Sequence, residues 1–263
     1  MANPAPPRRL RRIHYGKTAA LIGALSLAVI MGCAGTGDDW RTASHEPAGL
    51  APDPAVAPEA IVQVYAARAF GWRKYFGVHT WIAVKPANAA AYTVYEVIGW
   101  NLRWSGSVVS IGARAPDARW YGAVPEVLAE KRGPDAAALI ERIDQAARSY
   151  PWAREYTVWP GPNSNTFTAW VARAVPELRA DLPPTAIGKD YRGGQVFGSA
   201  PSGSGGQVSL YGLLGATASS VEGLEVNVLG LSFGIDPWPV ALRLPLAGRV
   251  GFSSDLGTSA DIP

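Results

Sequence analysis

Two neighbouring β-rich runs place the strongest constraint on the fold of this chain. Residues 78–85 and 92–99 are rich in β-branched and aromatic side chains, and the short connection between them, residues 86–91, begins with proline. Runs of this kind, joined by a short connection, are typical of a β-hairpin. The sequence therefore predicts two adjacent antiparallel strands, and residues 61–67 predict a further strand.

The hairpin brings a histidine close to a carboxylate. Side chains alternate between the two faces of a strand, so His79 and Trp81 share one face. If the hairpin closes Lys85 against Tyr92, Glu96 becomes the diagonal neighbour of His79 on that face. A slip of one residue would turn Glu96 to the opposite face. The contact is therefore predicted only for this register.

Helical periodicity follows between residues 124 and 175. Residues 124–131 are predicted to form a short helix, and Pro134 suits the first turn of a second helix. Residues 156–159 are predicted as a strand-like run that leads into a third helix. The apolar residues that recur at helical spacing are Leu139, Ile143, Ala147 and Tyr150, and then Phe167, Trp170, Val171 and Ala174.

The C-terminal part of the chain reads as β-structure. Bulky side chains alternate with glycine and serine from Leu229 to Ile235, which predicts a strand with one bulky face and one nearly bare face. The adjacent Lys189 and Asp190 are predicted to form an exposed ion pair. We expect an α+β fold, in which helices are inserted between the strands of an antiparallel sheet at residues 59–180. A β-rich extension, an antiparallel hairpin or small sheet, follows at 181–263.

The N-terminus has the composition of a targeting segment. Residues 1–32 hold five basic residues, no acidic residue and an apolar run, and Cys33 follows directly. This pattern is typical of a secretory signal and resembles a bacterial lipobox, which would make Cys33 the lipidated N-terminus. The alternative is an uncleaved membrane anchor. Residues 33–58 are predicted as a flexible linker, so we expect a protein of the bacterial envelope that is membrane-anchored and faces the periplasm.

Charge and cysteine content exclude several classes of partner. The formal net charge of +3 becomes −2 once residues 1–32, with their five basic residues, are removed. The basic character of the chain therefore belongs to the targeting segment, and nothing recommends a nucleic-acid partner. Cys33 is the only cysteine among 263 residues, so no disulfide forms within the chain. We expect no metal ion and no cofactor.

A polar helix start suggests a catalytic hypothesis. Ser164 is predicted in the first turn of the third helix, where backbone N–H groups are available to stabilise an oxyanion. A serine needs a base, and a histidine base works best when a third group orients it. We therefore assign Ser164 as nucleophile, His79 as base and Glu96 as the orienting group.

The same helix start also has a purely structural interpretation. Asn163 and Ser164 are both favoured at helix N-caps, so the stretch could serve only to begin the helix. In the catalytic interpretation Asn163, Asn165 and Trp81 are assigned as binding residues of the site. The sequence leaves both interpretations open.

Two segments resemble a known family of enzymes. Residues 78–83 and 163–167 resemble the permuted papain-like proteins that include the lecithin:retinol acyltransferase type. Those proteins carry a histidine on a strand and an Asn-Cys-x-x-Phe helix start. On this chain the base falls on His79 and the nucleophilic cysteine falls on Ser164. A serine is far less acidic than a thiol, so the resemblance implies either serine chemistry or lost activity.

A second resemblance covers more of the chain. The segments at residues 62–68, 79–83, 161–167 and 185–191 resemble a bacterial family of unknown function, DUF3750. That resemblance implies an envelope protein and supplies no activity. We are left with two functions: a serine-based papain-like hydrolase or acyltransferase acting on lipid, peptide or peptidoglycan, or a non-catalytic binding or structural lipoprotein with an aromatic-lined cleft.

Overall fold

The computed structural model describes residues 39–237 and 239–251. The chain divides into two compact units after Asp38, and every described residue belongs to the second unit. The predicted signal segment and Cys33 lie outside the described residues. Within the described ranges, no helix is long and apolar enough to cross a membrane.

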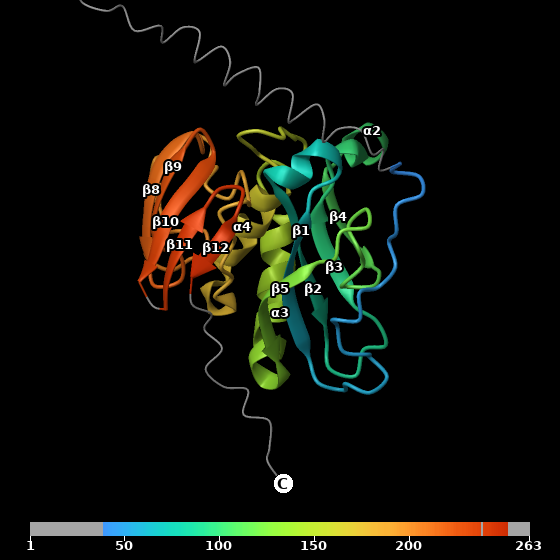
Figure 1. Cartoon of the computed structure of the whole chain (residues 1–263). Helices are drawn as coiled ribbons and strands as arrows, with labels where there is room; N and C mark the ends of the chain where they lie inside the picture. Colours follow the sequence, from blue (N-terminus) through green and yellow to red (C-terminus); the bar gives the residue numbers. More distant parts are fainter. Residues whose placement is uncertain (1–38, 238, 252–263) are drawn as a thin grey trace, which may run out of the picture. The chain divides into compact units, whose positions relative to one another are not determined.

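Five antiparallel strands form the first sheet, in the order β4-β3-β2-β1-β5 (Figure 1). The predicted hairpin is β2 and β3, and its register pairs Ile82 with Tyr95 and Val84 with Thr93. This is the register that results from closing Lys85 against Tyr92, so the hairpin prediction is confirmed. The strands are β1 (Ile61–Arg68), β2 (Val78–Lys85), β3 (Thr93–Val97), β4 (Val109–Ala113) and β5 (Glu126–Arg132).

Two helices, α3 (Gly133–Arg148) and α4 (Ser164–Ala174), pack on one face of this sheet (Figure 1). Pro134 stands in the first turn of α3, as predicted. The apolar stripes of both helices meet the sheet in a single core, because each stripe removes its side chains from water only when it faces another element. The central residues of that core are Val62, Val64, Ile82, Ile143, Phe167 and Val171.

Two predicted elements are different in the structure. The predicted helix at residues 124–131 is strand β5, because this segment pairs with β1 along the edge of the sheet and tertiary pairing overrides its helix propensity. The predicted strand at residues 156–159 is an irregular loop. Pro160 and Pro162 follow it, and proline cannot donate to a strand ladder.

The opposite face of the sheet is covered by the segment before β1. The backbone N–H of Leu50 donates to Asp117 Oδ2 (2.6 Å), and Tyr92 donates its hydroxyl to the carbonyl of Pro52 (3.0 Å). Ala57 is buried among the residues on this face, and Ala51 packs against them. Part of the predicted flexible linker is therefore ordered, since it buries the second face of the sheet.

Seven antiparallel strands form a second sheet, in the order β12-β11-β10-β9-β8-β7-β6. Each strand pairs with its neighbour in sequence, so the predicted C-terminal β-structure is larger than a hairpin. The strands are β6 (Phe197–Gly198), β7 (Gly206–Leu210), β8 (Leu214–Ser219), β9 (Gly223–Val228), β10 (Leu231–Pro237), β11 (Val240–Leu244) and β12 (Gly248–Gly251).

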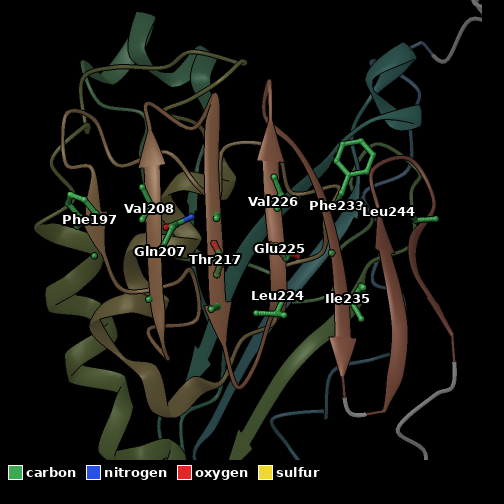
Figure 2. Close-up of a pocket in the computed structure, with 15 residues that line it drawn as sticks. Phe197, Gln207, Val208, Thr217, Leu224, Glu225, Val226, Phe233, Ile235 and Leu244 are labelled. Atoms are coloured by element: carbon green, nitrogen blue, oxygen red, sulfur yellow. The ribbon is translucent and has the colours of Figure 1, made fainter.

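In an ordinary two-layer protein the apolar face of a sheet is buried and its polar face is exposed. In the second sheet the apolar face is exposed and the polar face is buried. We call its exposed side the outer face, and Figure 2 shows this side with its apolar residues. The outer face carries Val208, Leu224, Val226, Phe233, Ile235 and Leu242, all of them exposed. The buried side of the same strands is polar and carries Gln207, Ser209, Glu225, Asn227, Ser232 and Arg243.

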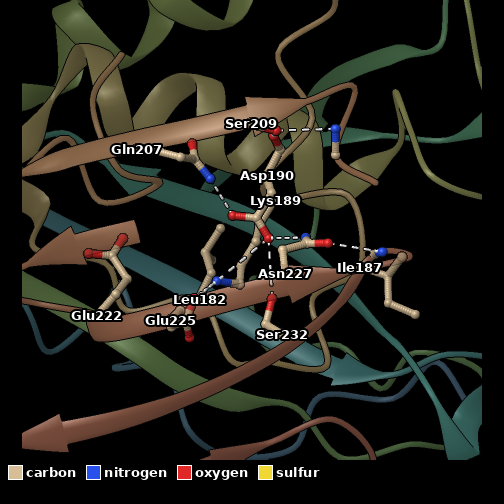
Figure 3. Close-up of polar contacts among 12 residues, drawn as sticks. Leu182, Ile187, Lys189, Asp190, Gln207, Ser209, Glu222, Glu225, Asn227 and Ser232 are labelled. Carbon is tan, nitrogen blue, oxygen red and sulfur yellow. Dashed lines mark hydrogen bonds and ion pairs between the residues drawn. The ribbon is translucent and has the colours of Figure 1, made fainter. Parts of the chain in front are cut away.

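Hydrogen bonds and ion pairs hold the polar side in place. Gln207, Asn227 and Ser232 converge on the carboxylate of Asp190 (Figure 3). The neighbouring Lys189 forms an ion pair with Glu225. Both members of the predicted exposed pair are therefore buried, and that prediction was wrong. The polar partners that bury them come from β7, β9 and β10.

Candidate functional site

The start of α4 is a complete capping box. Asn163 Oδ1 accepts hydrogen bonds from the backbone N–H groups of Asn165 (3.0 Å) and Thr166 (3.2 Å). Thr166 Oγ1 in return accepts from the backbone N–H of Asn163 (3.1 Å). The capping box therefore uses two of the first-turn N–H groups that the catalytic hypothesis needed for an oxyanion.

The same side chains join α4 to the segment that follows it. Asn163 Nδ2 and Asn165 Nδ2 both donate to the carbonyl of Ile187, at 3.0 and 2.8 Å. Thr166 Oγ1 donates to the carbonyl of Gly188 (2.8 Å). Gly188 has a φ of +98°, and a side chain there would overlap Asn163. The helix start thus locks the residue 187–188 turn in place, a role for Asn163 and Asn165 that the predicted binding role did not include.

Ser164 differs from its neighbours. It is buried, yet its hydroxyl forms no hydrogen bond with any residue that the structure describes. Its backbone carbonyl accepts from Thr80 Oγ1 (3.4 Å). Thr80 also donates to Asn165 Oδ1 (3.0 Å). The β2 side chain that meets the start of α4 is therefore Thr80.

His79 has the predicted carboxylate partner. Its Nε2 lies 3.1 Å from Glu96 Oε2. Arg114 Nε, from the segment after β4, donates to the other carboxylate oxygen of Glu96 (3.2 Å). Sequence reasoning did not find Arg114, since only the pairing of β3 with β4 brings it near. The three side chains form a buried His–Glu–Arg network.

Burial and pairing set the protonation of this network. Burial lowers the pKa of His79 and outweighs the hydrogen bond to Glu96, which raises it. Burial alone would raise the pKa of Glu96, but the hydrogen bonds and charges of His79 and Arg114 lower it further than burial raises it. At neutral pH Glu96 is therefore an ionised acceptor, and a neutral His79 donates Nε2–H to it.

Stacked rings connect His79 with the surface. Trp120 lies almost parallel to the His79 ring, with centroids 3.6 Å apart, and Trp81 stacks on His79 at 5.6 Å. Trp100, half exposed, lies 6.1 Å from Trp120. Trp81 itself is fully buried and donates its Nε1–H to the carbonyl of Pro116 (2.7 Å). It is part of the core, beneath the surface that a ligand would meet.

Ser164 and His79 project from different sides of the first sheet. His79 belongs to the side of Trp81, whereas the next residue, Thr80, contacts α4. No hydrogen bond joins Ser164 to His79 anywhere in the described ranges. The structure thus brings Glu96 to His79, and the use of Ser164 and His79 as a catalytic pair stays a prediction.

An exposed aromatic and basic surface lies at this end of the sheet. Two connections form it: η1 (Gly71–Tyr75), between β1 and β2, and η2 (Gly99–Asn101) with α2 (Leu102–Ser105), between β3 and β4 (Figure 1). Neither connection holds an acidic residue. We call this surface the aromatic end, and its exposed members are Trp72, Arg73, Tyr75, Trp100, Leu102, Arg103 and Trp104.

The two connections are held together by a shared aromatic contact. Tyr121 packs against Phe70, which precedes η1, and against Trp100 of η2. Gly99 lies so close to the ring of Tyr156 that any side chain there would collide with it. Sequence reasoning offered an aromatic-lined cleft as one alternative but did not find this cluster. The sequence signal that could have predicted it is a tryptophan next to an arginine in each of the two connections.

The buried His–Glu–Arg network predicts a pH-dependent stability. The unfolded chain protonates His79 below about pH 6.5, while the folded state keeps it neutral, so the unfolded state binds more protons as the pH falls. Stability is therefore complete above that pH and decreases below it, by at most about 1.4 kcal/mol per pH unit. Chemical denaturation between pH 7 and pH 5 should show this slope, and His79→Gln should flatten it. An unchanged slope in the variant would contradict the assignment.

The described residues contain no group of three or more His, Cys, Asp or Glu side chains placed to hold a metal ion. Fold and site together define an α+β protein with a buried His–Glu–Arg network beneath an aromatic surface. The family model described as a protein of unknown function (DUF3750) matches residues 59–191, about half of the chain. The chain belongs to this family. The match spans the five-stranded sheet, both long helices and the turn that the α4 start locks.

No curated protein and no solved structure matches the chain. The resemblance to the permuted papain-like fold therefore has no structural relative behind it and stays a prediction. Membership of the family supplies no activity, so the function is argued from the site.

Proposed function

We propose that this protein is a non-catalytic binding protein of the bacterial envelope, anchored by its N-terminus, whose aromatic end contacts an anionic membrane surface. The observation that carries the proposal is the clustering of exposed tryptophans with arginine on two connections at one end of the first sheet. Trp72 and Trp104 are 61 % and 84 % exposed. Water-exposed tryptophans of this number need a partner that takes up their apolar area.

Membrane interfaces suit this combination of side chains. Tryptophan and tyrosine favour the region between headgroups and acyl chains, since their rings are apolar and carry one polar group. Arginine and lysine beside them attract anionic headgroups, at about 1 kcal/mol for each charge near the surface. Arg73 and Arg103 are exposed next to Trp72 and Trp104. A short amphipathic surface of this type lies on the membrane without crossing it.

The rigid base under the aromatic end supports a binding role. Trp100 is stacked on Trp120, which is stacked on His79, and Glu96 and Arg114 fix the histidine below. A ring held by other rings loses little conformational freedom when it binds, so more of its interaction energy remains as affinity. In this proposal the network around His79 supports the surface and does no chemistry.

Vesicle binding tests the proposal. Residues 39–263, the second of the two units, should co-sediment with vesicles of equal parts phosphatidylglycerol and phosphatidylcholine. Trp100→Ala combined with Trp104→Ala should weaken binding roughly 30-fold, because each partly inserted ring contributes about 1 kcal/mol. Arg73→Ala should weaken binding to these vesicles but not to pure phosphatidylcholine.

The control for this test is Val56→Ala. Val56 is 78 % exposed and precedes Pro58, whose carbonyl accepts from Asn88 just beyond the other end of β2. Its loss should leave vesicle binding unchanged. Equal binding of the wild type and the double tryptophan variant would overturn the proposed function.

A further inference from the structure

The outer face of the second sheet is uninterrupted by polar side chains. Every outward-facing position from β7 to β11 holds an apolar residue or glycine. The side chains are well exposed, with Leu224 at 62 % and Ile235 at 53 %. A contiguous apolar surface of this kind marks an interaction site on a soluble domain.

The strand register cannot change to hide this face. A slip of one residue would exchange the two faces of a strand, but the inward side chains are fixed by buried charges. Arg243 Nε donates to Glu225 Oε1 (2.6 Å), and Arg243 also pairs with Asp181 (2.6 Å). Turning these groups outward would break the ion pairs that join the sheet to the preceding segment. The apolar face is therefore exposed as a consequence of the buried polar one.

The area of the outer face is close to the lower limit for a specific interface. Strands lie about 4.8 Å apart and each residue adds about 3.3 Å, so seven strands of four to five residues cover on the order of 450 Å². Two copies together contribute on the order of 1,000 Å², which is where specific interfaces begin. The side chains of the two outer faces project from the sheets, so their surfaces add to this buried area.

The outer face has an open cavity of about 930 Å³. The small residues Gly206, Ala216 and Ala218 are among those that line it. Larger side chains stand beside it, with Val208 on β7 and Leu224 on β9. A two-fold axis would set the raised β9 and β10 side chains of each copy into the cavity of the other, as isologous interfaces require. Two sheets packed face to face in this way form a sandwich.

Other occupants fit less well. The residues that follow β12, 252–263, hold only three bulky apolar side chains, too few to cover seven strands. The outer face carries no arginine or lysine to attract anionic headgroups. An apolar sheet with no charge is best matched by another such sheet.

We propose that the outer face is the interface of a two-fold dimer and that its occupant is a second copy of this chain. The proposal is independent of the lipid contact at the aromatic end. Each copy would keep its polar inner side against its own Asp181, Lys189 and Asp190 and bury its apolar side against the other copy.

Photo-crosslinking in the full-length chain tests the dimer. Two differently tagged copies are co-expressed, each with benzoylphenylalanine in place of Val226. Irradiation of the membranes should give a species of twice the chain mass that carries both tags. The same probe in place of Arg148, exposed on α3, should give at least tenfold less. Ile235→Glu, at an exposed position that leaves the monomer folded, should lower the Val226 product at least tenfold.

Four results would overturn the proposal. The first three are the absence of the doubled species, a lipid adduct at Val226 found by mass spectrometry, and a product of a different mass that contains another protein. An equal yield of the doubled species from the Arg148 position would also overturn it, since random collision would then explain both products.

Discussion

Asn163→Ala is expected to lower the free energy of unfolding by about 3 kcal/mol. The substitution removes the cap of α4, which alone is worth about 0.5–2 kcal/mol. The N–H groups that lose this acceptor are buried, which places the cap loss at the upper end of that range, and the substitution also removes the donor to the carbonyls of Val158 and Ile187. The loss of this donor adds about 1 kcal/mol or more. Urea denaturation of the wild type and the variant measures the difference.

Ser164→Ala is the matched control for this prediction. It changes the next residue, which is equally buried, but its hydroxyl makes no hydrogen bond in the described part of the chain. The control should therefore change stability by less than about 0.5 kcal/mol. Similar losses in both variants would contradict the structural role of Asn163. A fluorophosphonate probe that labels the wild type but not Ser164→Ala would instead support the serine hydrolase alternative.

The hairpin around His79 shows what local sequence can predict. Side chains alternate between the two faces of a strand, and the connection after Lys85 is short, so only a few registers are possible between β2 and β3. Once the register is chosen, the contact of His79 with Glu96 follows by counting residues. The helix start at Asn163 was predictable for the same reason, because capping depends on residues three positions apart.

The position of Ser164 relative to His79 could not be predicted in this way. The two residues are far apart in sequence, and period two gives the faces of β2 without saying which face receives α4. The structure places α4 on the side of Thr80. A shift of one residue along β2 would have reversed the outcome, and no local pattern fixes it.

For the second sheet, too, local sequence could not predict which face is buried. Alternation from Leu229 to Ile235 predicts a bulky and a bare face, and hydrophobicity alone would place the bulky face inside. The buried face is decided by Lys189 and Asp190, which meet partners from three strands. Nothing in the neighbouring sequence shows that these charges are buried, so an exposed pair was the natural expectation. Only the long-range pairing identifies the outer face.

Glu225→Ala is expected to be among the most damaging single substitutions in this chain, with a loss of about 3–5 kcal/mol. Glu225 is the shared partner of two buried cations, Lys189 and Arg243. Burial opposes the charge on Lys189, but the carboxylates of Asp190 and Glu225 outweigh burial and raise its pKa, so it remains charged. Removing Glu225 therefore takes the shared carboxylate from two buried cations, and leaves only the more distant Asp190 beside Lys189 and Asp181 beside Arg243.

A surface ion pair provides the control for this prediction. Glu177 pairs with Arg142 at 2.7 Å, nearly as closely as Glu225 pairs with Arg243, but the side chains of Glu177 and Arg142 are about half exposed. Glu177→Ala should cost less than about 1 kcal/mol, because water screens exposed charges. Denaturation of both variants at one pH gives the comparison. Equal losses would contradict the view that buried charges hold the second sheet.

A double substitution separates lost charge balance from lost packing. Lys189→Met in the Glu225→Ala background removes one of the two cations that lost their shared carboxylate and keeps an unbranched chain of similar length. Stability should then recover by roughly 1–2 kcal/mol over Glu225→Ala alone, as expected for residues that share one network. If the double variant were instead less stable than Glu225→Ala, packing and not charge would explain the loss. The orientation of the second sheet, and the exposure of its outer face, would then need a cause other than these ion pairs.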